Sequence, residues 1–205
     1  LETLLQWSYD EYQRPTCFAD AAATMKGSRC PASPTPAGWE PSADELLTHY
    51  TYWPDGDPYR RGFLRSACRG LQVKMGASVV FETQCLDTDY YTSIDSDGVC
   101  DVAEATGALA NLVKSKALCA GGSCLDGTGT LIYETTFEYD GHRRVCSVES
   151  RTAEQTIIQA STYTHDQYDN VIVESHSSDL DASSASNYDV AYQYDGMMRV
   201  VGSQK

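Results

Sequence analysis

The sequence predicts a mainly β fold in which antiparallel β-hairpin repeats form a meander or sandwich-like sheet, with one inserted helix near 101–118. Three observations support this prediction. A short motif recurs along the chain, tyrosine outnumbers phenylalanine (14 against 4), and one stretch shows helical spacing of apolar residues. Tyrosine carries a large apolar ring with a polar rim, which suits a sheet exposed on one face.

The recurring motif is a pair of aromatic residues two apart, followed by Asp. Its aspartates stand at 140, 166 and 195, which are 26 and then 29 residues apart. Such a recurrence is the sequence signature of a repeat architecture. The residues of the three copies are Tyr139, Asp140 and Arg144, then Tyr163 and Asp166, then Tyr192, Tyr194, Asp195 and Arg199.

Two weaker copies lie in the first third of the chain. One consists of Tyr9, Asp10 and Arg14, and a stretched one runs from Tyr50 to Asp55 and returns over 62–68. An Asp side chain can bond backbone N–H groups just ahead of it and start a turn. Each copy is therefore expected to be a hairpin in which Asp meets the Arg four residues later. An exposed pair of this kind stabilises little, so its main effect would be on strand register.

The remaining elements follow from local composition. Residues 27–44 contain four of the seven prolines and are expected to form a connector. Residues 71–75 and 77–83 alternate as a strand pair around Gly76. An acidic loop and the helix at 101–118 form an insertion over 86–125, and strands continue from 130 to the end. We expect one domain spanning 1–205.

The chain contains an even number of scattered cysteines and no CxxC pair, which favours disulfides formed in an oxidising compartment. An extracellular or cell-surface location follows as an expectation. Eight cysteines allow roughly a hundred pairings, and short spacings favour 17–30, 85–100 and 119–124, which leaves 68–146. The cysteines are Cys17, Cys30, Cys68, Cys85, Cys100, Cys119, Cys124 and Cys146.

Charge and hydropathy exclude two classes of partner. The chain has 29 acidic against 15 basic residues, a net charge of -14 that repels phosphate backbones and disfavours nucleic-acid binding. No stretch approaches the ~18 apolar residues of a membrane-spanning helix. The same negative charge favours the binding of cations.

Residues 93–104 resemble the calcium loop of EF-hand and dockerin-like modules. The resemblance implies ligands at alternate positions, with Gly98 at the sharp turn. Ser93 replaces the usual Asp at the first position and no entering helix precedes the loop, so an acidic turn without an ion is the alternative. The implied ligands are Ser93, Asp95, Asp97, Val99 (through its carbonyl), Asp101 and Glu104.

Catalysis has no positive support in the sequence. The four histidines form neither H-x-H nor HExxH, and the expected disulfides leave no thiol for a nucleophile. A pair of carboxylates from distant strands stays open for glycoside hydrolysis. We expect a protein that is not an enzyme.

The pattern aromatic–x–Tyr–Asp–x–x–x–Arg resembles the YD repeat of Rhs-type and teneurin-type proteins, most clearly over about 130–205. That resemblance implies antiparallel sheets that spiral into shells or extended surfaces, outside the cell or in secreted toxins. The family usually has Gly three residues after the Asp. Here that position is Gln13, Arg143, Asp169 or Met198, so we expect a different turn and no closed shell.

A linear array of hairpins exposes its two edge strands, which proteins either block or use. The leading hypothesis is a secreted structural subunit that stacks edge to edge into a fibre or surface layer as a homo-oligomer or polymer. The alternatives are an adhesin module that binds glycans with its tyrosine faces, and a fragment of a larger Rhs-type toxin shell. Because the chain opens at Leu1, we expect a processed chain or a cut fragment.

Overall fold

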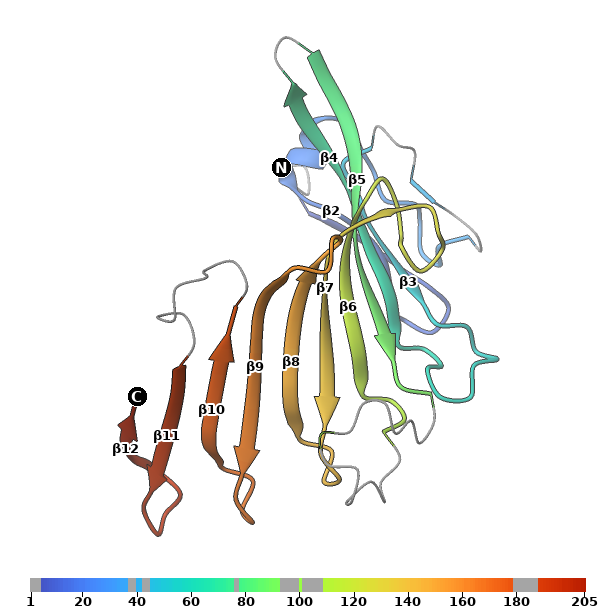
Figure 1. Cartoon of the computed structure of the whole chain (residues 1–205). Coiled ribbons are helices and arrows are strands. Elements are labelled where there is room, and N and C mark those ends of the chain that lie inside the picture. Colours follow the sequence, from blue (N-terminus) through green and yellow to red (C-terminus); the bar gives the residue numbers. More distant parts are fainter. Residues whose placement is uncertain are drawn as a thin grey trace. The chain divides into compact units, whose positions relative to one another are not determined.

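The computed structural model describes residues 5–36, 40–41, 45–75, 78–92, 100, 109–178 and 188–205. Within these ranges, twelve strands form one sheet in which each strand pairs with the next along the chain (Figure 1). The expected antiparallel meander is confirmed, and β1 and β12 are the two ends of the strand order.

The strands vary from four residues in β1 to thirteen in β5. A short helix, α1 (Ala21–Met25), follows β2, and Asp20 caps it by accepting a hydrogen bond from the backbone N–H of Ala23 at 2.8 Å. Across the described residues, no helix is long and apolar enough to span a membrane. The strands are β1 (Gln6–Tyr9), β2 (Pro15–Ala19), β3 (Thr48–Tyr52), β4 (Leu64–Met75), β5 (Ser78–Tyr90), β6 (Val113–Ala120), β7 (Thr130–Tyr139), β8 (Val145–Thr152), β9 (Ile157–His165), β10 (Val171–Ser177), β11 (Tyr188–Tyr194) and β12 (Val200–Gln204).

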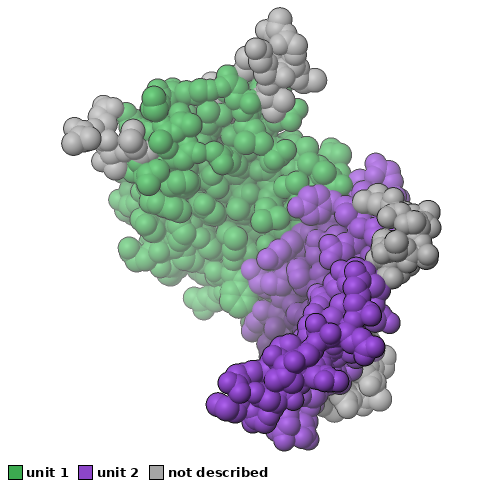
Figure 2. Space-filling model, turned by 90° about the vertical axis from the view of Figure 1, so that its left-hand side faces the viewer, with its two compact units in different colours: residues 1–88, 117–132 green, residues 89–116, 133–205 purple. Residues whose placement is uncertain are grey.

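Contacts within the chain divide it into two compact units (Figure 2). Unit 1 comprises residues 1–88 and 117–132, and unit 2 comprises 89–116 and 133–205. Each has a small core of its own, around Leu47 in unit 1 and around Leu109 in unit 2. Small cores leave much of the stabilisation to cross-strand contacts and disulfides. The single domain expected over 1–205 stays a prediction.

The prediction of a helix near 101–118 is wrong for its C-terminal end, because residues 113–118 belong to strand β6. Residues 101–108 lie outside the described residues. In β6 the half-buried Val113 and Ser115 alternate with the exposed Lys114 and Lys116, which is the period of a strand. The insertion is also shorter than expected, since residues 86–90 complete β5.

Four disulfides join all eight cysteines. The favoured pairs Cys17–Cys30 and Cys119–Cys124 are present. The pairings 85–100 and 68–146 are wrong, because the bonds are Cys68–Cys85 and Cys100–Cys146. The reason is register: β4 and β5 place Cys68 directly opposite Cys85, with their Cα atoms 4.0 Å apart. Short sequence spacing cannot reveal that alignment.

Candidate functional site

Four aspartates begin four turns of the same geometry, all between consecutive strands. In each, Oδ1 accepts hydrogen bonds from the backbone N–H groups two and four residues later, at 2.8 to 3.0 Å. The backbone N–H of the Asp also donates to the carbonyl of the fourth residue at 2.9 or 3.0 Å. These are three-residue hairpin loops with a bulge. The aspartates are Asp10, Asp140, Asp166 and Asp195.

The second carboxylate oxygen of each Asp binds the side chain four residues later. Arg14 and Arg144 donate through Nε at 2.6 Å, and Arg199 does so at 2.8 Å. Asn170 takes this place in the turn of Asp166, donating through Nδ2 at 2.9 Å. The predicted Asp–Arg contact is therefore present in all three copies that contain the Arg.

These bonds shift the acid pKa values. Burial raises the pKa of Asp140, but the hydrogen bonds from the side chain and backbone of Arg144 and from the backbone of His142 outweigh it, and the pKa lies below its usual value. Asp10 shows the same balance, with burial opposed by the bonds from Arg14 and Tyr12, and its pKa is also lowered. Both turns are thus held by an ionised carboxylate at neutral pH.

The position at which the family usually has glycine is left-handed in this chain too, and the expected difference from the family's turn stays a prediction. The residue three after the Asp has a left-handed backbone in every copy, with φ of 62° at Gln13, 66° at Arg143, 67° at Asp169 and 60° at Met198. Glycine adopts this conformation most easily, and other residues do so at a cost of about 1–2 kcal/mol. The two backbone bonds to the Asp carboxylate hold the loop in this conformation without a glycine.

Sequence reasoning missed a related turn between β8 and β9. The backbone N–H of Thr152 donates to the carbonyl of Thr156 at 3.0 Å, and Gln155 has φ of 66°. The Thr152 hydroxyl accepts from the Thr156 N–H at 3.3 Å, in place of a carboxylate. No aromatic pair precedes Thr152, so the motif gave no signal here. In the sequence, this turn could have been predicted only from the small polar residue Thr152 at its start.

In the stretched copy of the motif, the Asp that forms the turn is not the expected one. Asp57, and not Asp55, accepts the backbone N–H groups of Tyr59 and Arg60, at 3.0 and 2.8 Å. Arg60 closes this turn through Nε at 2.8 Å from the Asp57 carboxylate. The Asp and Arg are three residues apart here, so the strict spacing of the other copies does not find it.

The tyrosine before the Asp joins its hairpin to the preceding strand. The hydroxyl of Tyr139 donates to the carbonyl of Val113, the first residue of β6, at 2.9 Å. Tyr194 does the same to Val171, the first residue of β10, at 2.7 Å. Tyr52 in β3 reaches the first residue of β2 at 2.6 Å. Burial raises the pKa of Tyr139, so its hydroxyl stays protonated and can donate.

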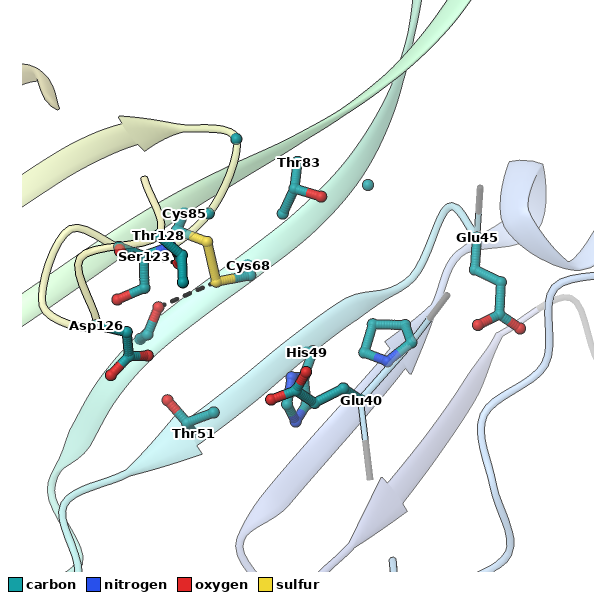
Figure 3. Close-up of a pocket in the computed structure, with 15 residues that line it drawn as sticks. Glu40, Glu45, His49, Thr51, Cys68, Thr83, Cys85, Ser123, Asp126 and Thr128 are labelled. Carbon is teal, nitrogen blue, oxygen red and sulfur yellow. Dashed lines mark hydrogen bonds between the residues drawn. A yellow bond between two sulfur atoms is a disulfide. The ribbon is translucent and has the colours of Figure 1, made fainter. Parts of the chain in front are cut away.

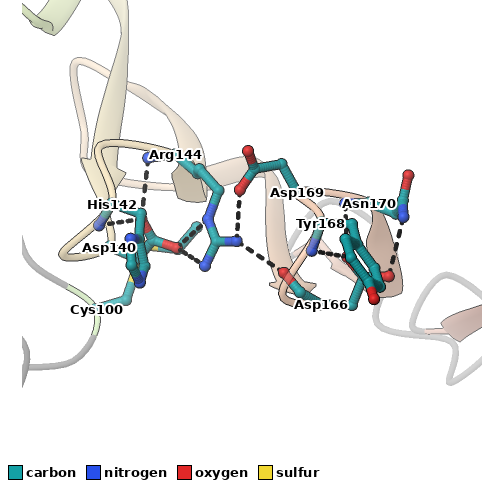
Figure 4. A network of polar contacts seen from close by, with 9 residues as sticks. Cys100, Asp140, His142, Arg144, Asp166, Tyr168, Asp169 and Asn170 are labelled. Carbon is teal, nitrogen blue, oxygen red and sulfur yellow. Dashed lines mark hydrogen bonds and ion pairs between the residues drawn. A yellow bond between two sulfur atoms is a disulfide. The ribbon is translucent and has the colours of Figure 1, made fainter.

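The arginine joins its turn to the following one. Beyond Asp140, Arg144 donates through Nη1 to the carbonyl of Asp166 and to Oδ1 of Asp169, both at 2.9 Å (Figure 4). Arg14 similarly reaches the next hairpin, where its guanidinium carbon lies 4.7 Å from the centre of the Tyr52 ring. The motif thus supplies a contact in each direction along the sheet.

The two edges of the sheet differ. Segment Cys30–Thr35 lies along β1, where the carbonyl of Tyr9 accepts from the Thr35 N–H at 2.8 Å and its N–H donates to Ser33 Oγ at 3.0 Å. The Cys17–Cys30 disulfide ties this segment to β2. At the other end of the strand order, β12 pairs with β11, and within the described residues no strand lies beyond it. The β1 edge is therefore covered by a segment of the chain itself.

Three polar side chains in unit 2 are arranged like a catalytic triad, but a substrate could not reach the serine hydroxyl. Ser161 Oγ lies 2.9 Å from His176 Nδ1, and His176 Nε2 lies 3.1 Å from Glu174 Oε1. This is the order nucleophile, base and orienting acid. Ser161 is only 3% exposed, so its hydroxyl cannot reach a substrate. Since Tyr192 also donates to Glu174 at 2.9 Å, the chain is a polar ladder that links β9, β10 and β11.

Unit 1 contains a cavity of about 320 Å³ (Figure 3). Its walls carry Glu40, Glu45, His49 and Asp126 together with the Cys68–Cys85 disulfide. Burial lowers the pKa of His49, with the charge of Glu40 opposing it, so burial favours the neutral ring. The described lining residues include no Phe, Tyr or Trp, the rings on which sugars most often stack.

One cluster contains residue types that often bind metal ions, but its cysteines are not available as ligands. Ligand atoms of Asp87, Cys119 and Cys124 lie within 4.8 Å of one another, but the two sulfurs form a disulfide and cannot bind a metal as thiolates. Asp87 Oδ2 instead accepts from Ser123 Oγ at 2.9 Å and from the Leu125 N–H at 3.1 Å. Asp87 therefore anchors the glycine-rich loop after β6.

The calcium ligands expected at 93–104 cannot be placed. Residues 93–99 and 101–108 lie outside the described residues, which leaves Cys100 of that loop, bonded to Cys146. Calcium binding by Ser93, Asp95, Asp97, Val99, Asp101 and Glu104 stays a prediction.

Comparison with known proteins gives little further information. No protein-family model matches the chain, and no curated protein matches it. One similar solved structure is described as the crystal structure of TcdB2-TccC3-Cdc42, at 11% sequence identity and a TM-score of 0.33. The match covers 99% of this chain and 14% of the other chain. The resemblance to YD repeats continues to rest on the motif.

Proposed function

We propose that this chain is a structural segment of an extracellular protein, a wall of β-hairpins. The observation that carries the proposal is the pair of contacts made by one motif, from Tyr139 back to Val113 and from Arg144 forward to Asp166. Residues that bind the hairpins on both sides serve to build an array, since each repeat is stabilised by its neighbours.

The extracellular part of the proposal is supported by the disulfides. All eight cysteines are paired, which is typical of chains that fold in an oxidising compartment. The net charge of -14 is also compatible with a soluble surface outside the cell and unfavourable for nucleic acid.

The covered β1 edge changes the form of assembly that we favour. Stacking into a fibre needs two open edges, one at each end of the strand order. Segment Cys30–Thr35 occupies the β1 side and is held there by a disulfide, which is how natural sheets block an edge. An array whose β1 side is blocked fits a part of a larger hairpin structure better than a symmetric fibre.

Native material tests this proposal. Intact-mass measurement and negative-stain imaging of protein purified from its source should show the chain within a larger polypeptide or assembly. Recovery of the 205-residue chain solely as a free monomer, at every pH and calcium concentration tried, would contradict it.

Glycan binding is a second candidate, favoured by the aromatic side chains on the first strands. Trp7 is 46% exposed, and its ring centre lies 4.3 Å from that of Phe18 and 6.2 Å from that of Tyr50. Partly exposed, adjoining rings provide apolar surface beside polar groups, as ligand sites do. A glycan array should then give hits that Trp7→Ala removes, and an array without hits would exclude this candidate.

A further inference from the structure

We propose that Asp87, Cys119 and Cys124 become a zinc site when the disulfide between the two cysteines is reduced. The oxidised protein already holds the three side chains together, with their ligand atoms within 4.8 Å of one another. Two thiolates and a carboxylate are ligands that zinc binds in tetrahedral sites. This site goes beyond the structural role proposed above and does not depend on it.

The separation between the buried sulfur and the carboxylate fits a shared metal ion. Cys119 Sγ lies 3.8 Å from Asp87 Oδ2. With zinc–sulfur and zinc–oxygen bonds of about 2.3 and 2.1 Å, two ligands at the tetrahedral angle are roughly 3.6 Å apart. The two sulfurs are held together by their covalent bond, and reduction breaks this bond, so that they can separate and bind one ion.

The carboxylate of Asp87 has unused capacity to bind a cation. Asp87 is only 1% exposed, and its Oδ1 is buried without a hydrogen-bond partner among the described residues. The other oxygen accepts from Ser123 Oγ and from the Leu125 N–H, which fixes the direction of the carboxylate. An ionised carboxylate offers about four lone-pair positions, and a buried oxygen without a partner is costly. A bound cation would supply the partner that Oδ1 lacks.

The loop that carries Cys124 has contacts that hold it in place without the disulfide. Three backbone hydrogen bonds of 2.9 to 3.1 Å close the stretch Ser123–Gly129 on itself. Cys119 lies in β6, next to β5 with Asp87, and the loop is bonded to Asp87 as well. Opening the disulfide therefore leaves both sulfurs beside the carboxylate. The ligands are positioned before the metal binds, which reduces the ordering cost of binding.

A thiol from outside the protein can open the disulfide. Cys119 is fully buried and Cys124 is half-buried, so an incoming thiolate attacks Cys124 Sγ, and Cys119 Sγ leaves with the electron pair and takes up a proton. A second external thiol resolves the mixed disulfide, which gives two protein thiols and one external disulfide. Zinc then releases both thiol protons to solvent and binds the thiolates. In reducing surroundings the ion would link β6 to the loop in place of the disulfide.

Cobalt(II) provides the first test, because tetrahedral cobalt with thiolate ligands absorbs strongly in the visible and shows a thiolate charge-transfer band. The full chain is reduced with a water-soluble phosphine, which becomes a phosphine oxide as it delivers two electrons to each disulfide. It is then titrated with cobalt and afterwards with zinc, without oxygen. We expect one tetrahedral cobalt per chain, its displacement by zinc, and a zinc-dependent rise in the melting temperature of the reduced protein. The oxidised protein should show none of these changes.

A double variant separates this site from the other thiols that reduction produces. Cys119→Ser with Cys124→Ser removes both thiolates and leaves the remaining cysteines to be reduced in the same way. The tetrahedral cobalt bands and the zinc-dependent rise in melting temperature should both disappear. Because the contacts of Asp87 with the loop do not involve these sulfurs, the loop keeps its anchor in the variant.

The role of the carboxylate is tested by a matched pair of variants. Asp87→Asn keeps the shape of the side chain and an oxygen acceptor, and it should raise the dissociation constant for zinc by more than about tenfold, since even residues that only orient a ligand have effects of this size. Asp126→Asn is the control. Asp126 is a 45% exposed carboxylate of the same loop that pairs with Arg65, and its loss should leave the dissociation constant unchanged.

Four results would overturn the inference. These are a reduced chain that binds no tetrahedral cobalt, cobalt bands that persist in the double cysteine variant, equal zinc affinities of Asp87→Asn and the unmodified protein, and a reduced chain that zinc does not stabilise.

Discussion

The Nη1 atom of Arg144 lies 2.9 Å from the carbonyl oxygen of Asp166, although the two residues belong to the turns of different hairpins. The same guanidinium binds Asp140 within its own turn. One side chain therefore closes a local loop and fixes the position of the next hairpin. This double role distinguishes Arg144 from an exposed surface arginine, and it leads to predictions about stability.

Replacing Arg144 by Ala should lower the free energy of unfolding by about 1–2 kcal/mol, because it removes charge-assisted bonds to two turns. Arg199→Ala is the matched control, since Arg199 contacts its own Asp and, among the described residues, no second turn. Urea unfolding of both variants measures the difference. Equal losses would show that the contact between turns contributes nothing.

Tyr139→Phe should lower the free energy of unfolding by about 1–2 kcal/mol, because it leaves the carbonyl of Val113 without its hydroxyl donor in a buried place. Tyr9 occupies the corresponding place in β1 and is 37% exposed, so Tyr9→Phe should have almost no effect. Thermal unfolding compares the two. A neutral Tyr139→Phe would remove the support for a linking role of the motif tyrosine.

Met198→Gly should raise the free energy of unfolding by about 0.5–1 kcal/mol, because Met198 has φ of 60°, a conformation that glycine adopts without strain. The neighbouring Met197 gives the control, since Met197→Gly adds flexibility to the unfolded chain and relieves no strain. Chemical denaturation should therefore show opposite signs for the two variants. Destabilisation by both would mean that the turn is not strained at Met198.

Stability should fall in acid. Burial acts to raise the pKa of Asp140, but its bonds to Arg144 and His142 lower the pKa below the ordinary value of 3.8. A carboxyl whose pKa is lower in the folded state stabilises above the unfolded pKa and loses this contribution as pH falls through the folded pKa. Urea midpoints should thus decrease below about pH 4, and Asp140→Asn should flatten this decrease. A parallel acid dependence in Asp140→Asn would refute the assignment.

Calcium remains to be tested at 93–104. If the loop binds the ion, chelation should lower the melting temperature and Asp97→Ala should make the protein insensitive to added calcium, since a ligand that binds the folded state stabilises it. Glu154→Gln, at an exposed turn position, is the control variant. An unchanged melting temperature on chelation would end the calcium hypothesis.

The turns could be read from the sequence because their bonds join residues within five positions of one another. Asp140 binds Arg144 through a spacing that is visible in the chain, and the same spacing finds the turns of Asp10 and Asp195. Where the chemistry changes, as at Thr152, or the spacing shortens, as at Asp57, the pattern fails although the loop is related. The left-handed residue before the Arg could not be read from the sequence, because a carboxylate and not a glycine stabilises it.

The sequence by itself determined that this chain is a series of β-hairpins, where several of them turn, and that its cysteines pair. The tertiary structure decided which residues lie opposite one another on neighbouring strands. It placed Cys68 opposite Cys85, brought Tyr139 to Val113, and laid Cys30–Thr35 along β1. The physical reason is register: a pattern of period two gives the face on which a side chain lies, but the sliding of one strand against the next is settled by packing and hydrogen bonds across the sheet.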